Sequence, residues 1–440
     1  MWNSKPLASA WRALGRLWPT PSGELKQGGP HGRDAAVNAL PAFLLLYVAL
    51  YAAYGVEGPF LTALLYERGM SAETIALMLA AGTALRLVSA PLAAAIADRF
   101  GAQKTVLGMA ILASAVVGCG FGLTSGFAAL FVVSMLHAAM LAPINPLSDA
   151  LAIRAATAHP ESGSRRGRGF DYGFVRGMGS AAFIVGATIA GPVVAGWGLS
   201  SVVWLAAVLL LLAAVAVPRL PRLASGSGAA MRSAEPAPAP RREPGAIRAL
   251  LALPAFRLLL LVSGLVQGSH ALYGAFATLS WQAAGVGPEA IGLLWSVAVA
   301  SEVLMFLVLG QPLMARIGPA GLSALAAAAG VLRWTVMAST SWLPAQFLVQ
   351  PLHGLTFAAQ HLAVMRLLAE AVPARFAGTA HGVHASFGPG LAGAFLTLAA
   401  GPLYANFGAD GYWAMAALCA VALPASFALA PVARRAAAAA

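Results

Sequence analysis

Two long stretches without a charged residue most strongly constrain how this chain folds. No Asp, Glu, Lys or Arg occurs from Thr105 to Ser148 or from Gly177 to Pro218. A membrane-crossing helix needs about 20 consecutive apolar residues, so each stretch is long enough for two crossings and a turn. Only 10% of the residues are charged, whereas soluble proteins have about a quarter. Continuous Leu, Ala and Val runs favour helices over barrel strands. These features predict an all-α polytopic membrane protein.

The apolar runs fall into two groups of six predicted transmembrane helices. The first six-helix bundle is expected over residues 38–217 and the second over 255–431. Residues 218–254 are rich in Pro, Ser, Gly and Arg, a composition that cannot bury a core, and we interpret them as a cytoplasmic linker. Residues 1–37 and 432–440 are expected to be cytoplasmic tails.

The positive charges are unevenly distributed along the chain. A net charge of +12 is compatible with nucleic-acid binding, but nearly all of the 27 Lys and Arg fall in segments on one predicted side of the membrane. Arg68 alone falls on the other side, and Arg86, Arg176 and Arg333 lie within predicted spans. The positive-inside rule then places both termini and the linker in the cytoplasm. We expect a multi-pass protein in a bacterial-type inner membrane, in contact with lipid and with no nucleic-acid partner.

An internal repeat explains the six-plus-six pattern. In one register, Gly58 aligns with Gly274, Glu73 with Glu289 and Leu136-His137 with Leu352-His353. A slightly shifted register aligns Ala190-Gly191-Pro192 with Ala400-Gly401-Pro402. Matches of Glu, His and Gly-Pro are rarer by chance than matches of Ala or Leu. The chain is therefore predicted to contain a duplicated six-helix unit.

This plan resembles that of the major facilitator superfamily, in which two six-helix repeats enclose the substrate cavity. Residues 94–106, AAIADRFGAQKTV, resemble the superfamily's loop between helices 2 and 3, with Asp98, Arg99 and Gly101 in place. The sequence departs from that motif at Ala94, where Gly is usual, and at Ala102 and Gln103, where basic residues are usual. A carboxylate that meets cations and a helix N-terminus makes a latch for the inner gate, and Asp98 is the candidate. The alternative is a solvated loop turn.

Charges inside the membrane are expensive and usually mark a pathway or a partner. Arg86 and Glu302 occupy equivalent positions of the repeat, so we predict that each half contributes one charge to a common cavity, with Glu302 as a proton carrier. The alternative is separate neutralisation, for example of Glu302 by Arg333. Glu57 lies on a segment of the first span that Gly58-Pro59 is expected to kink, and it is interpreted either as a second proton site or as a vestibule carboxylate.

A further charged pair is expected between the fourth and fifth spans. Asp149 ends the run Asn145-Pro146-Leu147-Ser148, and Arg176 lies early in the next helix. Adjacent antiparallel helices bring such residues together, so an ion pair is one interpretation. In the other, Arg176 holds a substrate carboxylate through two hydrogen bonds.

An acid on helix 8, an Arg on helix 9 and a His on helix 10 resemble the proton-coupling group of lactose-permease-type symporters. These residues are Glu302, Arg333 and His353 here, and the resemblance implies proton coupling by Glu302 and His353. The carboxylate that such permeases carry one turn after the histidine is replaced by Thr356. The proton is therefore expected to reside mainly on Glu302.

Several segments together are similar to the branch that contains the 3-phenylpropionate permeases and the nucleoside- and oligosaccharide-proton symporters. They share aromatic, Gly-Pro and charged positions spread over roughly residues 40–430, namely Tyr54-Gly55, Asn145-Pro146-Leu147-Ser148-Asp149-Ala150, Tyr172-Gly173 with Arg176, Ser301-Glu302-Val303, Arg333-Trp334 and Leu352-His353-Gly354. The resemblance implies proton symport of a small organic solute by alternating access. The arginines favour an aromatic or other small carboxylate. The candidate substrate contacts are Arg86, Arg176, Arg333, Tyr54 and Tyr273.

The sequence is also compatible with different functions. Gly191-Pro192 is similar to the helix-5 motif of efflux antiporters, although its copy at Gly401-Pro402 is equally explained as a duplicated helix end. A sugar or nucleoside symporter and a non-transporting sensor fit the sequence as well. No Gly-Lys dipeptide, HExxH, GxSxG or CxxC pattern occurs, which argues against an ATP-driven pump and against an enzyme. We expect no metal and no cofactor, only the proton gradient, and a monomer.

Overall fold

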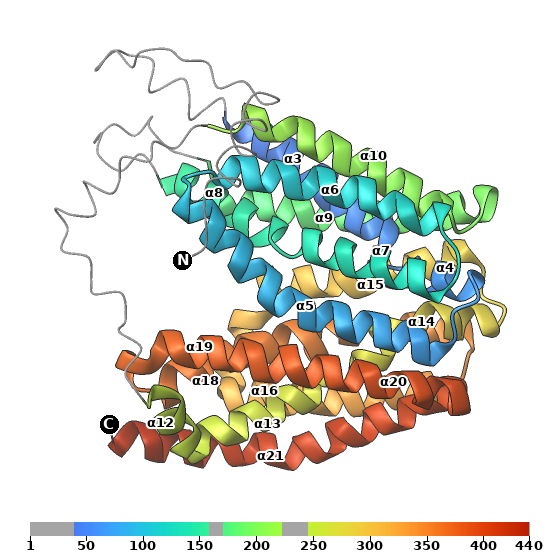
Figure 1. The fold of residues 1–440 in the computed structure, drawn as a ribbon. Helices are drawn as coiled ribbons and strands as arrows, with labels where there is room; N and C mark the ends of the chain where they lie inside the picture. The colour runs from blue at the N-terminus through green and yellow to red at the C-terminus, as the bar shows by residue number, and fades with distance from the viewer. Residues whose placement is uncertain (1–38, 158–169, 222–244, 440) are drawn as a thin grey trace, which may run out of the picture.

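The structure is a computed structural model that describes residues 39–157, 170–221 and 245–439. Within these ranges the chain forms helices and no strand (Figure 1). The predicted N-terminal tail and most of the predicted linker lie outside the described residues. The end of that linker is helical, as α12 (Ala246–Ala252).

The described residues of the first half form eight α-helices and one short 3₁₀ turn. They are α3 (Ala39–Glu57), α4 (Leu61–Glu67), α5 (Ala72–Arg99), α6 (Gln103–Leu123), α7 (Phe127–Leu141), α8 (Ile144–Thr157), α9 (Tyr172–Trp197), α10 (Ser201–Ala216) and η1 (Val217–Arg219).

The second half has the same plan with more interruptions. After α12 its elements are α13 (Pro254–Gly268), α14 (Ala271–Ala283), α15 (Pro288–Leu304), η2 (Met305–Leu309), α16 (Gly310–Ser339), α17 (Leu343–Val349), η3 (Gly354–Ala359), α18 (Gln360–Ala371), η4 (Ala374–Phe376), α19 (Ala377–Ala385), η5 (Ser386–Ala392), α20 (Gly393–Phe407), η6 (Gly408–Gly411) and α21 (Tyr412–Ala439).

The predicted fold class is confirmed. Among the described residues, 9 helical segments are long and apolar enough to cross a membrane. Two of them, Pro288–Ser339 with 52 residues and Ala377–Leu429 with 53, are each about twice the length that one crossing needs. Gly318, with φ at 69°, bends the chain between the two crossings of the first segment. The arrangement is consistent with twelve crossings.

Proline and glycine divide several crossings into two pieces. The expected kink at Gly58-Pro59 separates α3 from α4, because proline has no N–H to donate to the helix. In the second half, η2, η3 and η5 are π-helical. The π-helix is rare in proteins overall, but where it occurs it is often at a functional site. Two of them follow closely on residues of the predicted proton-coupling group, since η2 begins three residues after Glu302 and η3 directly after His353.

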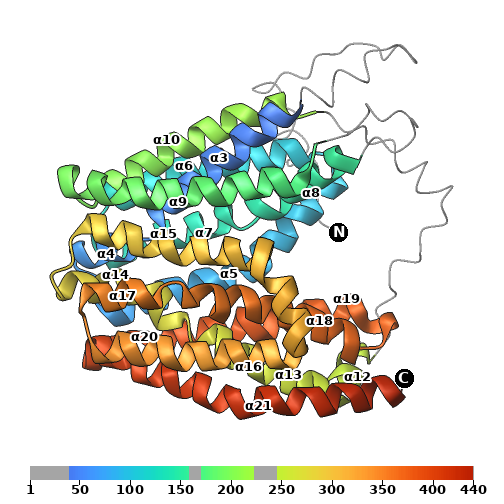
Figure 2. The ribbon, with the colours of Figure 1, turned by 180° about the vertical axis from the view of Figure 1, so that it is seen from behind.

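The two halves lie side by side and cross-pack through pairs of helices. Helix α9 packs against α15, α5 against α20, and α4 against α14 (Figures 1 and 2). The end of the molecule at which α3 begins and α21 ends is called the inner end below, after the orientation predicted from the arginines. The opposite end is the outer end.

Two glycines bring the halves into backbone contact at the outer end. A Cβ on Gly191 of α9 would lie 2.6 Å from Cα of Glu289, at the start of α15. A Cβ on Gly401 of α20 would lie 2.8 Å from Cα of Glu73, at the start of α5. Gly191 and Gly401 match in the sequence repeat, and so do Glu73 and Glu289. The duplicated Gly-Pro is therefore a pair of symmetric contacts between the halves.

Buried apolar residues show that the halves meet at the outer end and separate toward the inner end. One continuous core at the outer end joins Phe60 and Ile75 of the first half to Phe276 and Leu294 of the second. Toward the inner end each half has its own core, and the ribbons diverge there (Figure 1). This conformation is closed at the outer end.

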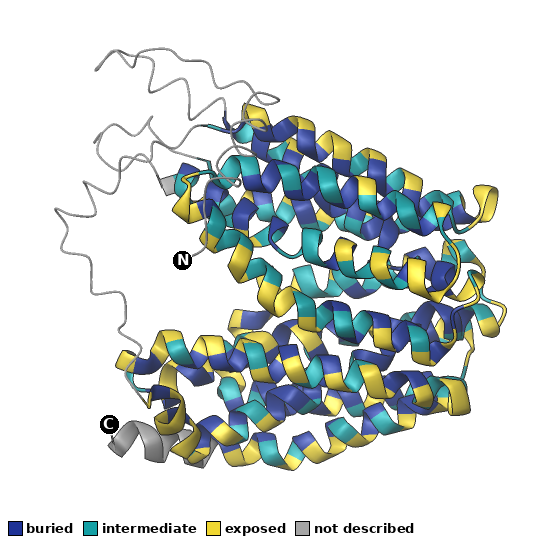
Figure 3. Ribbon diagram, in the orientation of Figure 1, coloured by how far each residue is buried: buried dark blue, intermediate teal, exposed yellow. Residues whose placement is uncertain are grey.

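Exposed residues lie along the outward faces of the bundles (Figure 3), and many of them are apolar. Val116 and Leu307, for example, are 71% and 74% exposed. A soluble protein rarely exposes apolar surface on this scale, whereas lipid tails solvate it at no cost. The faces are suited to contact with a bilayer.

Candidate functional site

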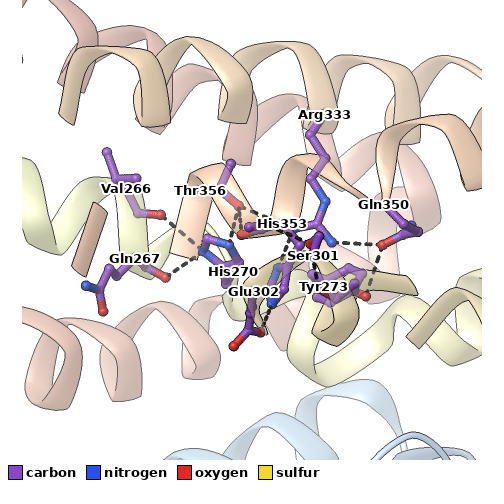
Figure 4. Close-up of polar contacts among 12 residues, drawn as sticks. Val266, Gln267, His270, Tyr273, Ser301, Glu302, Arg333, Gln350, His353 and Thr356 are labelled. Carbon is purple, nitrogen blue, oxygen red and sulfur yellow. Dashed lines mark hydrogen bonds and ion pairs between the residues drawn. The ribbon is translucent and has the colours of Figure 1, made fainter. Parts of the chain in front are cut away.

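The acid and the histidine of the predicted proton-coupling group form a contact in the second half of the chain. Oε1 of Glu302, on α15, lies 2.7 Å from Nε2 of His353, which directly precedes η3 (Figure 4). The two side chains are 21% and 11% exposed. The pair is thus mostly, but not fully, removed from solvent.

Arg333 of α16 holds the other face of His353. Its Nη1 lies 2.7 Å from Nδ1 of His353, and its Nη2 donates to Oε1 of Gln350 at 2.9 Å. Because a guanidinium only donates, Nδ1 of His353 must accept, and the ring proton must then lie on Nε2, toward Glu302. His353 cannot take a second proton without losing the bond to Arg333. Within this contact, the Glu302 carboxylate is the group that can bind a proton without breaking the bond between His353 and Arg333.

The Arg333 charge is enclosed by aromatic rings and has no carboxylate partner among the described residues. Its guanidinium lies 4.3 Å from the ring centre of Tyr273 and 4.5 Å from that of Trp334. The residue is fully buried, and Tyr273 donates to the same Gln350 oxygen. Arg333 and Tyr273, both expected to contact substrate, instead support His353 in this conformation.

A glycine sets the distance between the acid and the histidine. The N–H of Gly354 donates to Oγ of Ser301 at 2.9 Å. A Cβ on Gly354 would lie 2.5 Å from the carbonyl oxygen of Ser301, so any other residue would push η3 away from α15. Ser301 and Gly354 immediately neighbour Glu302 and His353 in the chain. The close backbone approach therefore brings the two functional side chains within reach.

His270, which is not among the residues predicted for the site, joins this group to a cavity. Its Nε2 lies 2.9 Å from Oγ1 of Thr356, and its ring is 5.2 Å from that of His353. Nδ1 lies 3.2 Å from the carbonyl oxygens of Val266 and Gln267, at the break between α13 and α14. Its place within an apolar span was the only sequence signal for it.

The cavity lies between the halves at mid-depth and has a volume of about 310 Å³. The first half contributes Arg86, His137 and Phe121 to its wall, and the second contributes His270 and Gln267. Within the described part of the chain, Arg86 has no ion pair and no hydrogen bond, in contrast to Arg333. The cavity combines one available cation with polar and apolar walls.

A second acid and histidine meet in the first half. Oε1 of Glu57, at the end of α3, lies 3.4 Å from Nδ1 of His137 on α7, and both side chains are nearly buried. Arg86 and Tyr54 lie within electrostatic range of this region. Tyr54 donates to Asn145 at 3.4 Å. His137 also packs edge-on against Phe121.

Asp149 and Arg176 do not form the ion pair that was one interpretation of the sequence. The Asp149 carboxylate accepts from Oη of Tyr47 at 2.6 Å instead. Arg176 lies over the ring of Tyr51, 4.5 Å from its centre, and donates to Ser180. The two tyrosines stack on each other and separate the charges. Arg176 is within electrostatic range of Glu302 across the halves.

Among the described residues, the predicted latch contacts side chains of its own half. Oδ1 of Asp98 accepts from Gln103 at 2.7 Å, and Gln103 in turn accepts from Arg154 of α8 at 2.9 Å. Gly101 has φ at 58°, a region that favours glycine, and turns the chain into α6. Arg99 lies over the ring of Phe100. These contacts tie α5, α6 and α8 together at the inner end.

Comparison with known proteins identifies relatives along nearly the whole chain. Residues 40–415 match the MFS_1 like family. The "probable 3-phenylpropionic acid transporter" of Escherichia coli (strain K12) is 32% identical over 87% of this chain and 94% of its own length. The maltose permease of Geobacillus stearothermophilus is 25% identical over 86% of this chain and 91% of its own length.

Solved structures with the same fold are also transporters. The nucleoside transporter NupG matches with a TM-score of 0.73 at 16% identity, over 89% of this chain and 98% of that one. A bacterial homolog of the human lysosomal transporter Spinster, in an inward-facing and unoccupied conformation, matches with a TM-score of 0.63 at 16% identity, over 93% and 99%. The chain is therefore not an enzyme but a membrane transporter that belongs to the MFS_1 like family of the major facilitator superfamily.

Proposed function

We propose that this transporter is a proton-coupled symporter that takes up a small carboxylate, with an aromatic acid as the first candidate. It works by alternating access in a bacterial-type inner membrane, as a monomer and without a cofactor. Both termini and the segment 218–254 lie on the cytoplasmic side. The observation that carries the proposal is the contact between Glu302 and His353, with the ring of His353 fixed by Arg333.

The proton is carried by Glu302. A buried carboxylate is costly unless it is neutralised, so closing a dry cavity around Glu302 is favoured when a proton is bound. Arg333 holds His353 as a neutral donor, which leaves the carboxyl to gain and lose the proton. His270 connects this group to the cavity wall, so substrate in the cavity changes the surroundings of the proton site.

The substrate binds in the cavity of about 310 Å³ between the halves. Arg86 attracts its carboxylate, since a guanidinium can bind both oxygens. Phe121, Met78 and Leu79 offer apolar surface for a ring or chain. The identity of 32% with a transporter named for 3-phenylpropionic acid supports the same substrate class here.

Opening and closing use the two ends of the molecule in turn. The contacts of Gly191 and Gly401 close the outer end, as seen here, and the latch residues Asp98, Arg99 and Gly101 close the inner end. Close packing between halves accounts for both Gly-Pro copies without an antiport motif. Uptake is thus favoured over efflux.

A neutral sugar is the second candidate substrate, because the maltose permease is similar over 86% of this chain. It would hydrogen-bond to Gln267, Ser134 and Thr83 of the cavity wall and would not need Arg86. Binding of a carboxylate substrate therefore requires Arg86, whereas binding of a neutral sugar does not.

Uptake into proteoliposomes tests the proposal. The lumen is made alkaline and the exterior acid, and labelled 3-phenylpropionate, maltose and a nucleoside are supplied in turn, with protein-free liposomes subtracted. Protein-dependent accumulation of 3-phenylpropionate that collapses with a protonophore is expected. Accumulation only with the gradient reversed would contradict symport and indicate efflux.

Replacing Arg86 separates the two substrate classes. Arg86→Gln is expected to raise KM for 3-phenylpropionate by about 10- to 100-fold, because a charge-assisted hydrogen bond is worth about 1.5–3 kcal/mol. The matched control is Arg248→Gln, which removes an exposed arginine of α12 outside the cavity. An unchanged KM would show that Arg86 does not bind the carboxylate.

A further inference from the structure

Each half of the transporter contains one acid–histidine pair, but the surroundings of the two histidines differ. His137 and His353 match in the sequence repeat, and each lies beside a carboxylate. The carboxylates come from unrelated helices, α3 for Glu57 and α15 for Glu302. The two pairs therefore share equivalent histidines, but their carboxylates come from helices that are not equivalent in the repeat.

The hydrogen bonds of the two histidines differ in one decisive respect. Nδ1 of His353 accepts from Arg333, which prevents a second proton on that ring. Nδ1 of His137 faces the Glu57 carboxylate at 3.4 Å, and its Nε2 is buried without a hydrogen-bond partner among the described residues. Nε2 of His137 is therefore open to a proton, which would leave the ring facing Glu57 as a cation.

The surroundings of His137 favour a small ion and little else. The gap beside it is lined by Glu57, Ser114 and Gly118, together with apolar side chains of α10. A Cβ on Gly118 would lie 3.4 Å from Nε2, and Oγ of Ser114 is also buried without a partner in the described chain. Unpartnered polar atoms in a native protein call for an explanation, such as a proton that is exchanged there. On its other side, His137 lines the substrate cavity.

The charge beside the pair makes proton binding depend on substrate. The titratable groups within electrostatic range are Arg86 on α5, which is charged, and the neutral hydroxyl of Tyr54 on α3, while the residues of α6 and α10 that line the gap are uncharged. Glu57 and Arg86 balance each other when the site is empty. A carboxylate substrate beside Arg86 adds one negative charge, and a proton on Nε2 of His137 restores neutrality.

We infer that the Glu57–His137 pair is a second proton-binding site, so that two protons accompany each carboxylate. This inference rests on the proposed symport. One proton neutralises Glu302, and the other passes from cavity water to Nε2 of His137 and back to water on the inner side. Two protons with one monoanion carry one net positive charge inward, whereas a single proton would make transport electroneutral.

The number of charges moved per substrate molecule tests the two-proton inference directly. The full chain is reconstituted, and addition of 3-phenylpropionate at zero membrane potential is followed both as current and as labelled uptake. Diffusion of the protonated acid through lipid carries no charge but adds labelled uptake, so the uptake by protein-free liposomes is subtracted before the ratio is taken. The expected ratio is about one positive charge per substrate for the unaltered protein, because the proton excess over the anion is one.

Removing the second site should make transport electroneutral without abolishing it. His137→Gln and Glu57→Gln are each expected to lower the ratio from about one to about zero in the uptake that each variant retains. The matched control His381→Gln, at an exposed histidine of α19, keeps the ratio at about one. An electroneutral unaltered protein, or variants that keep its ratio, would overturn the second site and leave single-proton symport standing. Absence of proton-dependent uptake would instead overturn the proposed function.

Discussion

Glu302→Gln is expected to remove the Glu302 proton from coupling, so that accumulation of substrate against its gradient falls while exchange stays intact. Glutamine resembles the protonated carboxyl in shape and charge, so the loaded transporter can still close and reorient. It cannot release a proton, so the empty transporter no longer returns in the form that couples to the gradient. Each coupled proton supports about tenfold accumulation per pH unit, and this factor should fall to about one.

The measurement compares two assays in the same vesicles. Gradient-driven accumulation of 3-phenylpropionate should fall by about tenfold per pH unit, and exchange of internal for external label at equal pH should stay within about threefold of the unaltered protein. Glu289→Gln is the matched control, because Glu289 is an exposed acid in the first turn of the same helix. Undiminished accumulation by Glu302→Gln would show that another group carries the proton.

Gly191→Ala is expected to prevent closure of the outer end and to stop transport. The new Cβ would lie 2.6 Å from both the Pro288 oxygen and Cα of Glu289, and neither backbone atom can move without displacing α15. The halves would have to separate at the outer end, where they share one apolar core. Overpacking of a tight core costs about 1–3 kcal/mol, enough to shift a two-state equilibrium by about 5- to 150-fold.

Labelling of a cavity residue reports on this change. Ala275 lines the cavity and is buried, so a cysteine placed there should react with an impermeant maleimide from outside only when the outer end opens. Labelling is expected to rise in Gly191→Ala and not in Gly196→Ala, since a Cβ on Gly196 of the same helix meets nothing within 4 Å. Equal labelling of the two variants would show that Gly191 does not control the outer gate.

The symmetric contacts of Gly191 and Gly401 also show what the sequence repeat could and could not predict. The match of Gly191-Pro192 with Gly401-Pro402 predicted a duplicated feature but not its purpose. The purpose depends on which helix of the other half faces each glycine, and α15 and α5 begin far from α9 and α20 in the chain. The sequence pattern of one helix does not specify which helix of the other half packs against it.

The candidate site divides in the same way. The contact between Glu302 and His353, with Arg333 behind it, was expected from resemblance to known permeases. The pairing of Glu57 with His137 and of Asp149 with Tyr47 was not expected, because these contacts join helices that are not neighbours in sequence. Tyr47 and Tyr51 gave no signal in the sequence, since tyrosines in an apolar run are common packing residues.

The sequence by itself determined the membrane setting, the helical class and the duplicated plan of this protein. Charge-free runs have no stable alternative to helices in lipid, where every backbone hydrogen bond must be satisfied within the segment. Only the tertiary structure decided which buried charges meet, which end is closed and which histidine is held by an arginine. These outcomes depend on distances of a few ångströms between helices, and those distances are set by packing at residues such as Gly191 and Gly354 rather than by local sequence.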